Sequence, residues 1–396
     1  MNDECTPVLN TGLRGVDVAS SKICDVQGKK GKLIYRGYRI EDLAENTTFE
    51  EVCYLLLHER LPERQTLAAF DDRLKHKRRI PDSVVTLLKH LPRSMDPMDV
   101  LQAATPLLVQ ADEKAGTENR EDVVNSAEYL IAGLSSLIAA WDRIRNDKSP
   151  VTPDTSLGHA ANFLYMLTGD FPDPEVAAFF DAGLVLHAEH SFNASTFTAR
   201  QVASTKAHIY AAITAAIGSL SGPLHGGANV RVMKMLMKIG SAENIDAYID
   251  DVLDAGGLIM GLGHAVYQTD DPRALILAPM SLRMGEIIGD TRWYDLSRKL
   301  EVQSKEAFKK RKNREIFCNV DFYSASLFYA MGIPMDLFTP VFALSRVSGW
   351  CAHVIEERFA GAAPKPTLYR PGAAYVGDYC GPEECRFVTI ENRQKR

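Results

Sequence analysis

The sequence predicts a mostly α-helical fold with a short β segment near the N-terminus, and two patterns support this expectation. Apolar residues recur at helical spacing along most of the chain after Ile40, and polar connectors such as DEKAGTENRED and RNDKSPVTPDTS separate the repeats. Before Ile40, β-branched pairs flank the turn signal GKKGK, so residues 16–36 are expected to form a small hairpin or meander. Together these patterns indicate many packed helices and one small β segment.

The helices are expected where apolar residues form a stripe on one face. In residues 123–141 the stripe comprises Val123, Ala127, Leu130, Ile131, Leu134, Leu137, Ile138 and Trp141. Comparable stripes predict helices over residues 50–58, 98–112, 156–168, 174–189, 206–220, 230–239, 245–259 and 322–331. No repeat with the period of a solenoid accompanies them.

Length and composition indicate a globular protein of two or three domains. The chain has 396 residues, of which 46% are apolar and 24% charged, values that argue against disorder or a coiled coil. The net charge of −6 argues against nucleic acid or a membrane surface as a partner, because such partners usually need a basic face. The acidic, polar start MNDECTPVLN does not resemble a signal peptide, and no run approaches the roughly 20 apolar residues that span a bilayer. We therefore expect a cytoplasmic enzyme.

The seven cysteines are scattered without the paired spacing of zinc or redox sites. Cys380 and Cys385 are the nearest pair, but the spacing in CGPEEC is too wide for CxxC chemistry. Free thiols in a reducing compartment, and no metal, are the expectation.

Three histidines have glycine or small polar residues beside them. These are His190 in LHAEHSFNAS, His225 in SGPLHGGAN and His264 in GLGHAVYQTDDPR. Glycine removes side-chain bulk, so a ligand can reach the backbone and the imidazole together. A packed core histidine would explain any one of them, but three such sites in one chain favour a functional role.

Acidic and basic residues supply the other half of the candidate chemistry. Asp321 in CNVDFYSAS lies between two apolar residues, where desolvation would raise its pKa toward that of a useful base. The same carboxylate could instead cap the helix expected to begin near Phe322. Arg273, Arg346 and Arg370 are candidates for binding a carboxylate, which a guanidinium can bind bidentately, although a surface ion pair would also explain each of them.

Five sequence blocks, taken together, resemble the citrate synthase family. They are SGPLHGGAN, GLGHAVYQTDDPR, NVDFYSASLFYAMGIP, FTPVFALSRVSGW and RPGAAYVG, and IYRGYRIEDLAENTTFEEVCYLLL resembles the opening segment of that family. The resemblance extends from about Gly31 to about Gly377, with block order and spacing intact. It implies an all-α homodimer with a large helical domain of residues 1–221 and 326–396, which contains the dimer interface, and a small helical domain of residues 222–325 that closes over the cleft.

The resemblance also implies a function and a residue for each step. The family condenses acetyl-CoA with oxaloacetate and hydrolyses citryl-CoA to citrate and CoA, an acyltransferase reaction of the tricarboxylic acid cycle. His225 matches the histidine that stabilises the enol of acetyl-CoA, Asp321 the aspartate that removes the methyl proton, and His264 the histidine that polarises the ketone of oxaloacetate. The matches to the oxaloacetate-binding residues are His190, Arg273, Arg346 and, from the second subunit, Arg370. No cofactor is implied, because the coenzyme A thioester is a co-substrate.

For coenzyme A, the resemblance implies that the adenine is held by backbone groups of Met260, Gly261, Leu262 and Gly263. The basic run KKRKNR offers Lys312 and Arg314 as phosphate ligands, unless it is only a solvated basic face. If a helix begins just after His225, its dipole disfavours the imidazolium, so the neutral ring can donate a hydrogen bond to a carbonyl oxygen.

Several positions depart from the commoner family pattern. Ala265 and Gln268 stand where many bacterial relatives have arginine and lysine, which puts the affinity for CoA in question. Cys318 and Ala325 stand where relatives often have proline and glycine. Glu189 in AEHSFNAS is similar to 2-methylcitrate synthases, so a synthase that uses propionyl-CoA is one alternative. A non-catalytic relative that binds oxaloacetate and CoA is another.

Two unrelated enzyme classes remain as competing hypotheses. A metal-dependent hydrolase would use His187 and His190 on one helix, but no HExxH motif or second ligand pair accompanies them. A dinucleotide oxidoreductase would use GLGHAV, but no strand is expected before it and the GxGxxG pattern is incomplete.

Overall fold

The computed structural model describes residues 12–13, 15–263, 266–374 and 389–392. The chain forms two units. The main unit is Ser21–Leu368, and the two ends of the chain, Met1–Ser20 and Tyr369–Arg396, form the terminal unit. The regular element in the described part of the terminal unit is the short 3-10 helix η4 (Ile390–Asn392).

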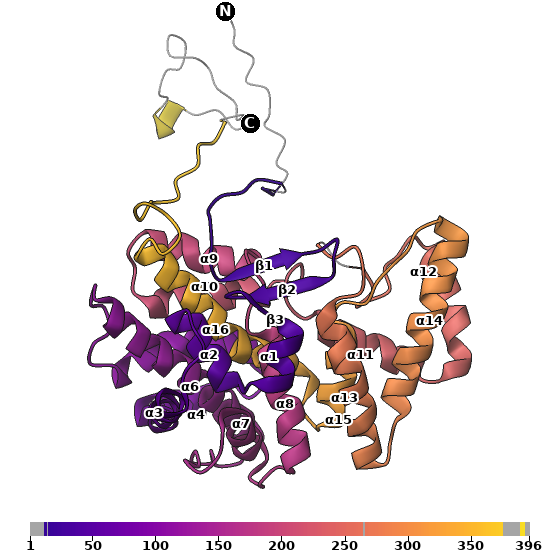
Figure 1. Cartoon of the computed structure of the whole chain (residues 1–396), viewed down its shortest axis with the longest axis horizontal. Coiled ribbons are helices and arrows are strands. Elements are labelled where there is room, and N and C mark those ends of the chain that lie inside the picture. The colour runs from indigo at the N-terminus through magenta and orange to yellow at the C-terminus, as the bar shows by residue number, and fades with distance from the viewer. Residues whose placement is uncertain (1–11, 14, 264–265, 375–388, 393–396) are drawn as a thin grey trace, which may run out of the picture. The chain divides into compact units, whose positions relative to one another are not determined.

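The main unit is mostly α-helical, as the apolar periodicity predicts (Figure 1). Its α-helices are α1 (Ile40–Asn46), α2 (Phe49–His58), α3 (Arg64–His76), α4 (Asp82–His90), α5 (Pro97–Ala104), α6 (Arg120–Arg145), α7 (His159–Thr168), α8 (Pro174–His187), α9 (Ala194–Ser204), α10 (Ile209–Ser221), α11 (Ala228–Ile239), α12 (Ile245–Asp254), α13 (Pro272–Ile288), α14 (Arg292–Lys312), α15 (Val320–Ala330) and α16 (Phe338–Arg358). Shorter 3-10 helices are η1 (Thr105–Ala111), η2 (Ala242–Asn244) and η3 (Met335–Leu337), and the strands are β1 (Cys24–Gln27), β2 (Lys32–Tyr35) and β3 (Tyr38–Arg39).

The three strands form one antiparallel sheet in the order β1-β2-β3, which confirms the expected N-terminal hairpin. Cys24 lies opposite Tyr35 and Gln27 lies opposite Lys32. The turn between β1 and β2 is closed by a hydrogen bond of 2.9 Å from the Lys30 amide to the Gln27 carbonyl. The glycines of GKKGK therefore lie in the turn, as the sequence predicts.

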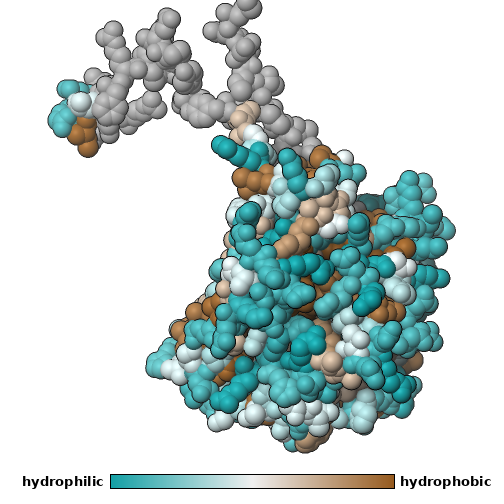
Figure 2. Space-filling model, turned by 60° about the vertical axis from the view of Figure 1, so that its left-hand side comes forward, coloured by the Kyte–Doolittle hydropathy of each residue, from teal (hydrophilic) through white to brown (hydrophobic). Residues whose placement is uncertain are grey.

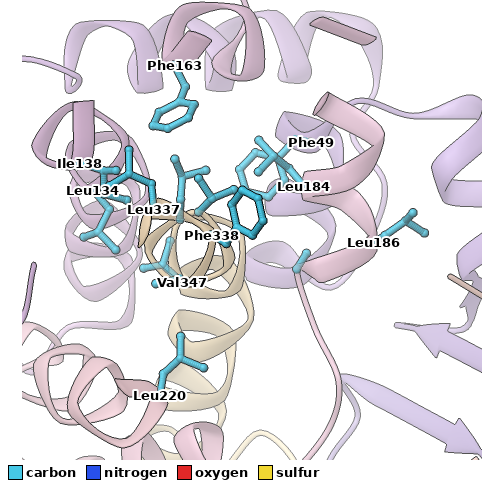
Figure 3. Packing of buried hydrophobic residues seen from close by; sticks show 14 of the residues in the cluster. Phe49, Leu134, Ile138, Phe163, Leu184, Leu186, Leu220, Leu337, Phe338 and Val347 are labelled. Atoms are coloured by element: carbon cyan, nitrogen blue, oxygen red, sulfur yellow. The ribbon is translucent and has the colours of Figure 1, made fainter. Parts of the chain in front are cut away.

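Helix α16 lies in the core and is buried along almost its whole length. Figure 3 shows Phe338 and Val347 of this helix with Leu134 of α6 and Leu184 of α8 among the surrounding core side chains. A helix that is covered on all sides needs no polar face, so its sequence has no amphipathic stripe. For this reason no amphipathic stripe predicts α16.

Helix α6 is long and apolar enough to cross a membrane by length and composition, but 89% of its apolar window is buried inside the protein. It is therefore a core helix of the main unit. On the face of the molecule shown in Figure 2, hydrophilic side chains predominate and hydrophobic ones are scattered among them.

Two further differences separate the expected helices from the observed ones. The single helix predicted over residues 98–112 is α5 followed by η1, because Pro106 has no amide hydrogen for the bond that would continue α5. Helix α14 was missed because its buried apolar residues, Trp293, Leu296 and Leu300, form only a narrow stripe in a strongly charged sequence.

Helices α11, α12, α13 and α14 lie together on one side of the main unit, coloured from salmon pink to orange in Figure 1. Helix α13 packs against α14 and α15, and α12 packs against α14. These four helices fall within residues 222–325, which the family resemblance assigns to a small domain. The division of the main unit into two domains stays a prediction.

Candidate active site

Segments that are far apart in the sequence surround one cleft of about 770 Å3 in the main unit. The lining comes from β1, the turn after α8, the loop between α10 and α11, the start of α13, the start of α15 and the middle of α16. Six of the predicted site residues line it, namely His190, His225, Gly263, Arg273, Asp321 and Arg346.

His225 lies in the loop that joins α10 to α11, just before the start of α11 that the sequence analysis expects. Its Nε2 is 2.7 Å from the Ser195 hydroxyl and accepts a hydrogen bond of 3.2 Å from the Ser195 amide. Because an amide can only donate, the neutral ring has its proton on Nδ1, which is left to donate to a bound molecule. Burial, with a smaller contribution from the charge of Arg346, lowers the pKa of His225 to about 4, so the ring is neutral near pH 7.

The two glycines after His225 serve the turn itself. A Cβ at Gly226 would overlap the Leu220 carbonyl oxygen at the end of α10. Gly227 has a φ of 71° and precedes α11 as its N-cap, in a conformation that favours glycine. Ligand access is therefore not the only reason for these glycines, because the backbone of the turn requires both of them without any ligand.

Asp321 is the second residue of α15. The alternative that Asp321 caps this helix is wrong, because the cap is Asn319, whose side chain accepts the Asp321 amide at 3.0 Å. Burial raises the pKa of Asp321 to about 6, although the nearby charge of Arg273 acts in the opposite direction. Such a carboxylate is mostly ionised at pH 7 and is a stronger base than an ordinary aspartate.

Arg273 and Arg346 both place positive charge at the cleft, but they differ in whether a carboxylate pairs with them. Arg273 already has a buried carboxylate partner, since its Nε and Nη2 donate to Asp271 at 2.9 and 2.6 Å. Arg346 donates from Nε to the His187 carbonyl at 2.6 Å, and its guanidinium carbon lies 4.5 Å from the centroid of the Phe342 ring. Within the described residues Arg346 forms no direct ion pair with a carboxylate, although the charge of Glu189 acts on it, so its guanidinium can still bind an anion in the cleft.

His190 lies just beyond the end of α8. Its ring meets the Tyr267 ring edge-on, with 5.7 Å between the centroids. The hypothesis that His187 and His190 share a helix is wrong, because α8 ends at His187. His187 is a buried core histidine whose Nδ1 bonds to the Gly183 carbonyl at 2.7 Å, and burial lowers its pKa to about 3. The two rings therefore do not form the helical pair that a metal-dependent hydrolase would use.

Two residues predicted for catalysis or oxaloacetate binding have no described position at the cleft. His264, together with the neighbouring departure Ala265, lies outside the described residues. Arg370 belongs to the terminal unit rather than to the unit that contains the cleft. Their roles stay predictions. Among the cysteines, Cys5, Cys380 and Cys385 also lie outside the described residues, and the four described ones are free thiols.

The residues predicted to bind CoA are spread over the edge of the cleft and beyond it. Gly263 lines the cleft, and with Arg314 and Gln268 it also lines a second hollow of about 330 Å3. Residues 260–262 directly precede Gly263 in the chain, and Leu262 forms an isolated β-bridge with Cys318. Lys312 is the last residue of α14, is exposed, and is not part of the lining of either hollow.

Sequence reasoning missed Ser195, which fixes the ring of His225. The Ser195 hydroxyl also lies 2.8 Å from Asn193 Oδ1 and accepts a hydrogen bond of 3.1 Å from the Trp350 indole nitrogen. Asn193 is the N-cap of α9, where its side chain accepts the amide of Thr196. The sequence NAST is a recognisable helix start, but no local signal places it under a histidine thirty residues later.

One group of side chains suited to metal binding occurs in the described part of the chain. The donor atoms of Asp270, Glu301 and Cys318 lie within 4.8 Å of one another. The ammonium of Lys305 lies 2.8 Å from Asp270 Oδ1 and 2.7 Å from Glu301 Oε1. Because Lys305 bridges both carboxylates and Arg298 pairs with Glu301 at 2.8 Å, two cations balance the two acids, and we interpret the group as a structural cluster of ion pairs.

The cleft thus combines a base, a neutral hydrogen-bond donor and positive charge in a desolvated space. A proton next to a carbonyl group is weakly acidic, so its removal needs a base and a hydrogen bond to the developing oxyanion at the same time. Asp321 and His225 can supply these two groups, and Arg346 can bind a carboxylate. This arrangement suits a reaction that forms an enol and joins it to an anionic substrate.

Comparisons with known proteins agree with this chemistry. A family model described as citrate synthase, C-terminal domain, matches residues 12–372. The chain is 44% identical to the citrate synthase of Haloferax volcanii over 97% of its own length and 99% of that relative. It is 38% identical to a 2-methylcitrate synthase of Shewanella oneidensis, covering 93% of this chain and 95% of the relative. The solved ternary complex of citrate synthase from Thermoplasma acidophilum with carboxymethyl coenzyme A and oxaloacetate is similar with a TM-score of 0.88 and 30% identity, covering 98% of this chain and all of that one.

Proposed function

The chain belongs to the citrate synthase family, and on that premise we propose that it condenses acetyl-CoA with oxaloacetate and hydrolyses the resulting citryl-CoA to citrate and CoA. It is an acyltransferase, like its relatives. The observation that supports this reaction most directly is the pairing of a neutral His225 with an Asp321 of raised pKa in one cleft.

The first step that we propose is removal of a proton from the methyl group of acetyl-CoA. The Asp321 carboxylate takes the proton, and the electron pair of the broken C–H bond moves onto the thioester carbonyl. His225 donates its Nδ1 hydrogen to the carbonyl oxygen as negative charge develops there. Removing a single donor of this kind typically costs about 3–4 kcal/mol of transition-state stabilisation.

In the second step the enol carbon attacks the ketone carbon of oxaloacetate. We assign polarisation of the ketone to His264 and binding of the two carboxylates to Arg273, Arg346 and, in a homodimer, Arg370 of the partner subunit. Two nitrogens of Arg273 are held by Asp271, so this arginine offers oxaloacetate its remaining Nη1 in a fixed orientation. His190 is the fourth group that we assign to this substrate, and its position at the cleft supports the assignment.

Hydrolysis of the citryl-CoA thioester then releases citrate and CoA. We propose that residues 260–263 hold the adenine, that Lys312 and Arg314 meet the phosphates, and that residues 222–325 close over both substrates as a small domain. The ligands of the Thermoplasma acidophilum structure, carboxymethyl coenzyme A and oxaloacetate, support two adjoining subsites of this kind. We also propose that the protein works in the cytoplasm.

The test is a steady-state assay of free thiol release by the purified chain with oxaloacetate, comparing acetyl-CoA and propionyl-CoA at equal concentration. We expect a higher kcat/KM with acetyl-CoA, and no release by Asp321→Asn. The 38% identity to a 2-methylcitrate synthase makes the reverse preference the main alternative, since pockets distinguish one methylene by only about 1–3 kcal/mol. Binding of oxaloacetate without thiol release from either thioester would instead identify a non-catalytic relative.

A further inference from the structure

The turn of the β1–β2 hairpin contacts the segment that follows His264. We call residues 28–31 the hairpin turn and residues 266–270 the post-histidine segment. The Gln268 amide donates a hydrogen bond of 3.0 Å to the Gly28 carbonyl. A Cβ at Gly28 would overlap the carbonyl oxygen of Val266, so the two backbones touch directly. The far side of the turn makes a second contact, because a Cβ at Gly31 would lie 2.8 Å from Thr269 Cγ2.

The C-terminal end of the post-histidine segment is fixed independently of the hairpin. The Cys318 amide donates to Asp270 Oδ1 at 3.0 Å, and the Asp271 amide donates to the Cys318 carbonyl at 3.0 Å. Lys305 adds an ion pair to Asp270. The hairpin turn therefore supports the half of the segment that is nearer to His264, while the other half is fixed beside Arg273.

The segment and the hairpin both belong to the wall of the cleft. Val266 lines the cleft, and so do Cys24, Asp25 and Val26 of β1. The Tyr267 ring lies edge-on to that of His190. A displacement of the segment would therefore change the shape of the cleft on the side where we place oxaloacetate.

We propose that the hairpin turn positions the post-histidine segment, and through Val266 and Tyr267 the wall of the cleft beside His190, for oxaloacetate, with Gly28 as the positioning residue. This inference rests on the proposed function of His190. Gly28 does not touch substrate. Its role is to let two backbones approach more closely than any side chain would allow. A methyl group there must push the Val266 carbonyl away, and a misplacement of about 1 Å in an active site can cost about 100-fold in rate.

The test compares Gly28→Ala with Lys30→Ala, a change in the same turn at an exposed side chain. We expect kcat/KM for oxaloacetate to fall by about 10- to 100-fold in Gly28→Ala, and its Kd, measured by calorimetry, to rise. The thermal midpoint should stay within a few degrees of the wild-type value, and Lys30→Ala should behave like the wild type. A Gly28→Ala protein with wild-type affinity and turnover would overturn the proposal, and so would equal losses in both variants.

A second measurement needs no substitution. Hydrogen exchange at the Gln268 amide should be slow in the wild-type protein, and exchange as fast as in exposed loops would overturn the proposed contact even if Gly28→Ala does not fold. The calorimetric Kd separates this inference from the proposed function. A wild-type chain that binds oxaloacetate but releases no thiol refutes the function, whereas Gly28→Ala that binds oxaloacetate as tightly as the wild type refutes the positioning role.

Discussion

Substituting Asp321 by asparagine should make the protein inactive and more stable at the same time. Folding raises the pKa of this carboxyl from 3.8 to about 6, and one unit corresponds to about 1.4 kcal/mol, so the ionised group lowers the free energy of unfolding by up to about 3 kcal/mol above pH 6. Asparagine removes this penalty but also removes a favourable charge from the first turn of α15, worth about 0.3–1 kcal/mol. We therefore expect a net gain of about 2 kcal/mol at pH 8, with a loss of about 100- to 10,000-fold in turnover.

The sign of the pH dependence makes the expectation specific. A carboxyl whose pKa is raised by folding destabilises the protein only where it is ionised, so the gain should be complete above pH 6 and absent below the ordinary value of 3.8. Urea unfolding at pH 8 and pH 4 measures it. The matched control is Asp246→Asn, because Asp246 is the second residue of α12 as Asp321 is of α15, but is exposed. The reasoning is refuted if Asp321→Asn is less stable than the wild type at pH 8, if its gain is the same at both pH values, or if it keeps more than half of the turnover.

The pH profile, the subunit arrangement and the contact with CoA give three further tests. The kcat/KM for acetyl-CoA should fall below about pH 6 as Asp321 is protonated, and His225 should add no limb between about pH 5 and 8; a flat profile over that range would contradict the assignment of Asp321, and a second acid limb within it would contradict that of His225. Inactive Arg370→Ala and inactive Asp321→Ala proteins should, after subunit exchange, regain partial thiol release in mixed dimers, and mixed dimers as inactive as their parents would exclude a role for Arg370 across the interface. Gln268→Lys should lower the KM for acetyl-CoA by about tenfold at most without changing kcat, with the gain lost in added salt; an unchanged KM at low ionic strength would mean that Gln268 does not face the phosphates or that a group within residues 309–314 already holds them.

Whether a helix could be predicted depended on how strongly its two faces differ in hydrophobicity. Helix α6 was expected because its apolar residues form a long stripe, and the structure confirms it. Helix α16 was missed because it is covered by other helices on all sides, which leaves no face for polar residues. The sheet was expected from turn chemistry, which is local. That its turn reaches Val266 is a long-range contact, and no spacing in the sequence contains that information.

The candidate site shows the same division between local and distant information. The glycines beside His225 correctly indicated this histidine as a cleft residue. Ligand access explains them only in part, since the turn itself requires Gly226 and Gly227. The competing reading of Asp321 as a helix cap was wrong by two positions, because Asn319 has the better capping side chain and leaves the carboxylate to the cleft. Ser195 was missed because its relation to His225 exists only after α9 and α10 pack together.

Burial shifts the pKa values of both groups that act in the proposed first step. Burial disfavours charge, so it lowers the pKa of a histidine and raises that of an aspartate, and the two groups of this cleft shift in these opposite directions. The result is a ring that stays a neutral donor and a carboxylate that is a better base, without any direct contact between them. The arginines then act on the two groups differently: Arg346 drives His225 further toward the neutral form, whereas Arg273 holds Asp321 closer to the ionised form. Removing the charge of Arg273 should therefore move the acid limb of the pH profile upward, while removing that of Arg346 should leave the limb in place and affect oxaloacetate binding instead.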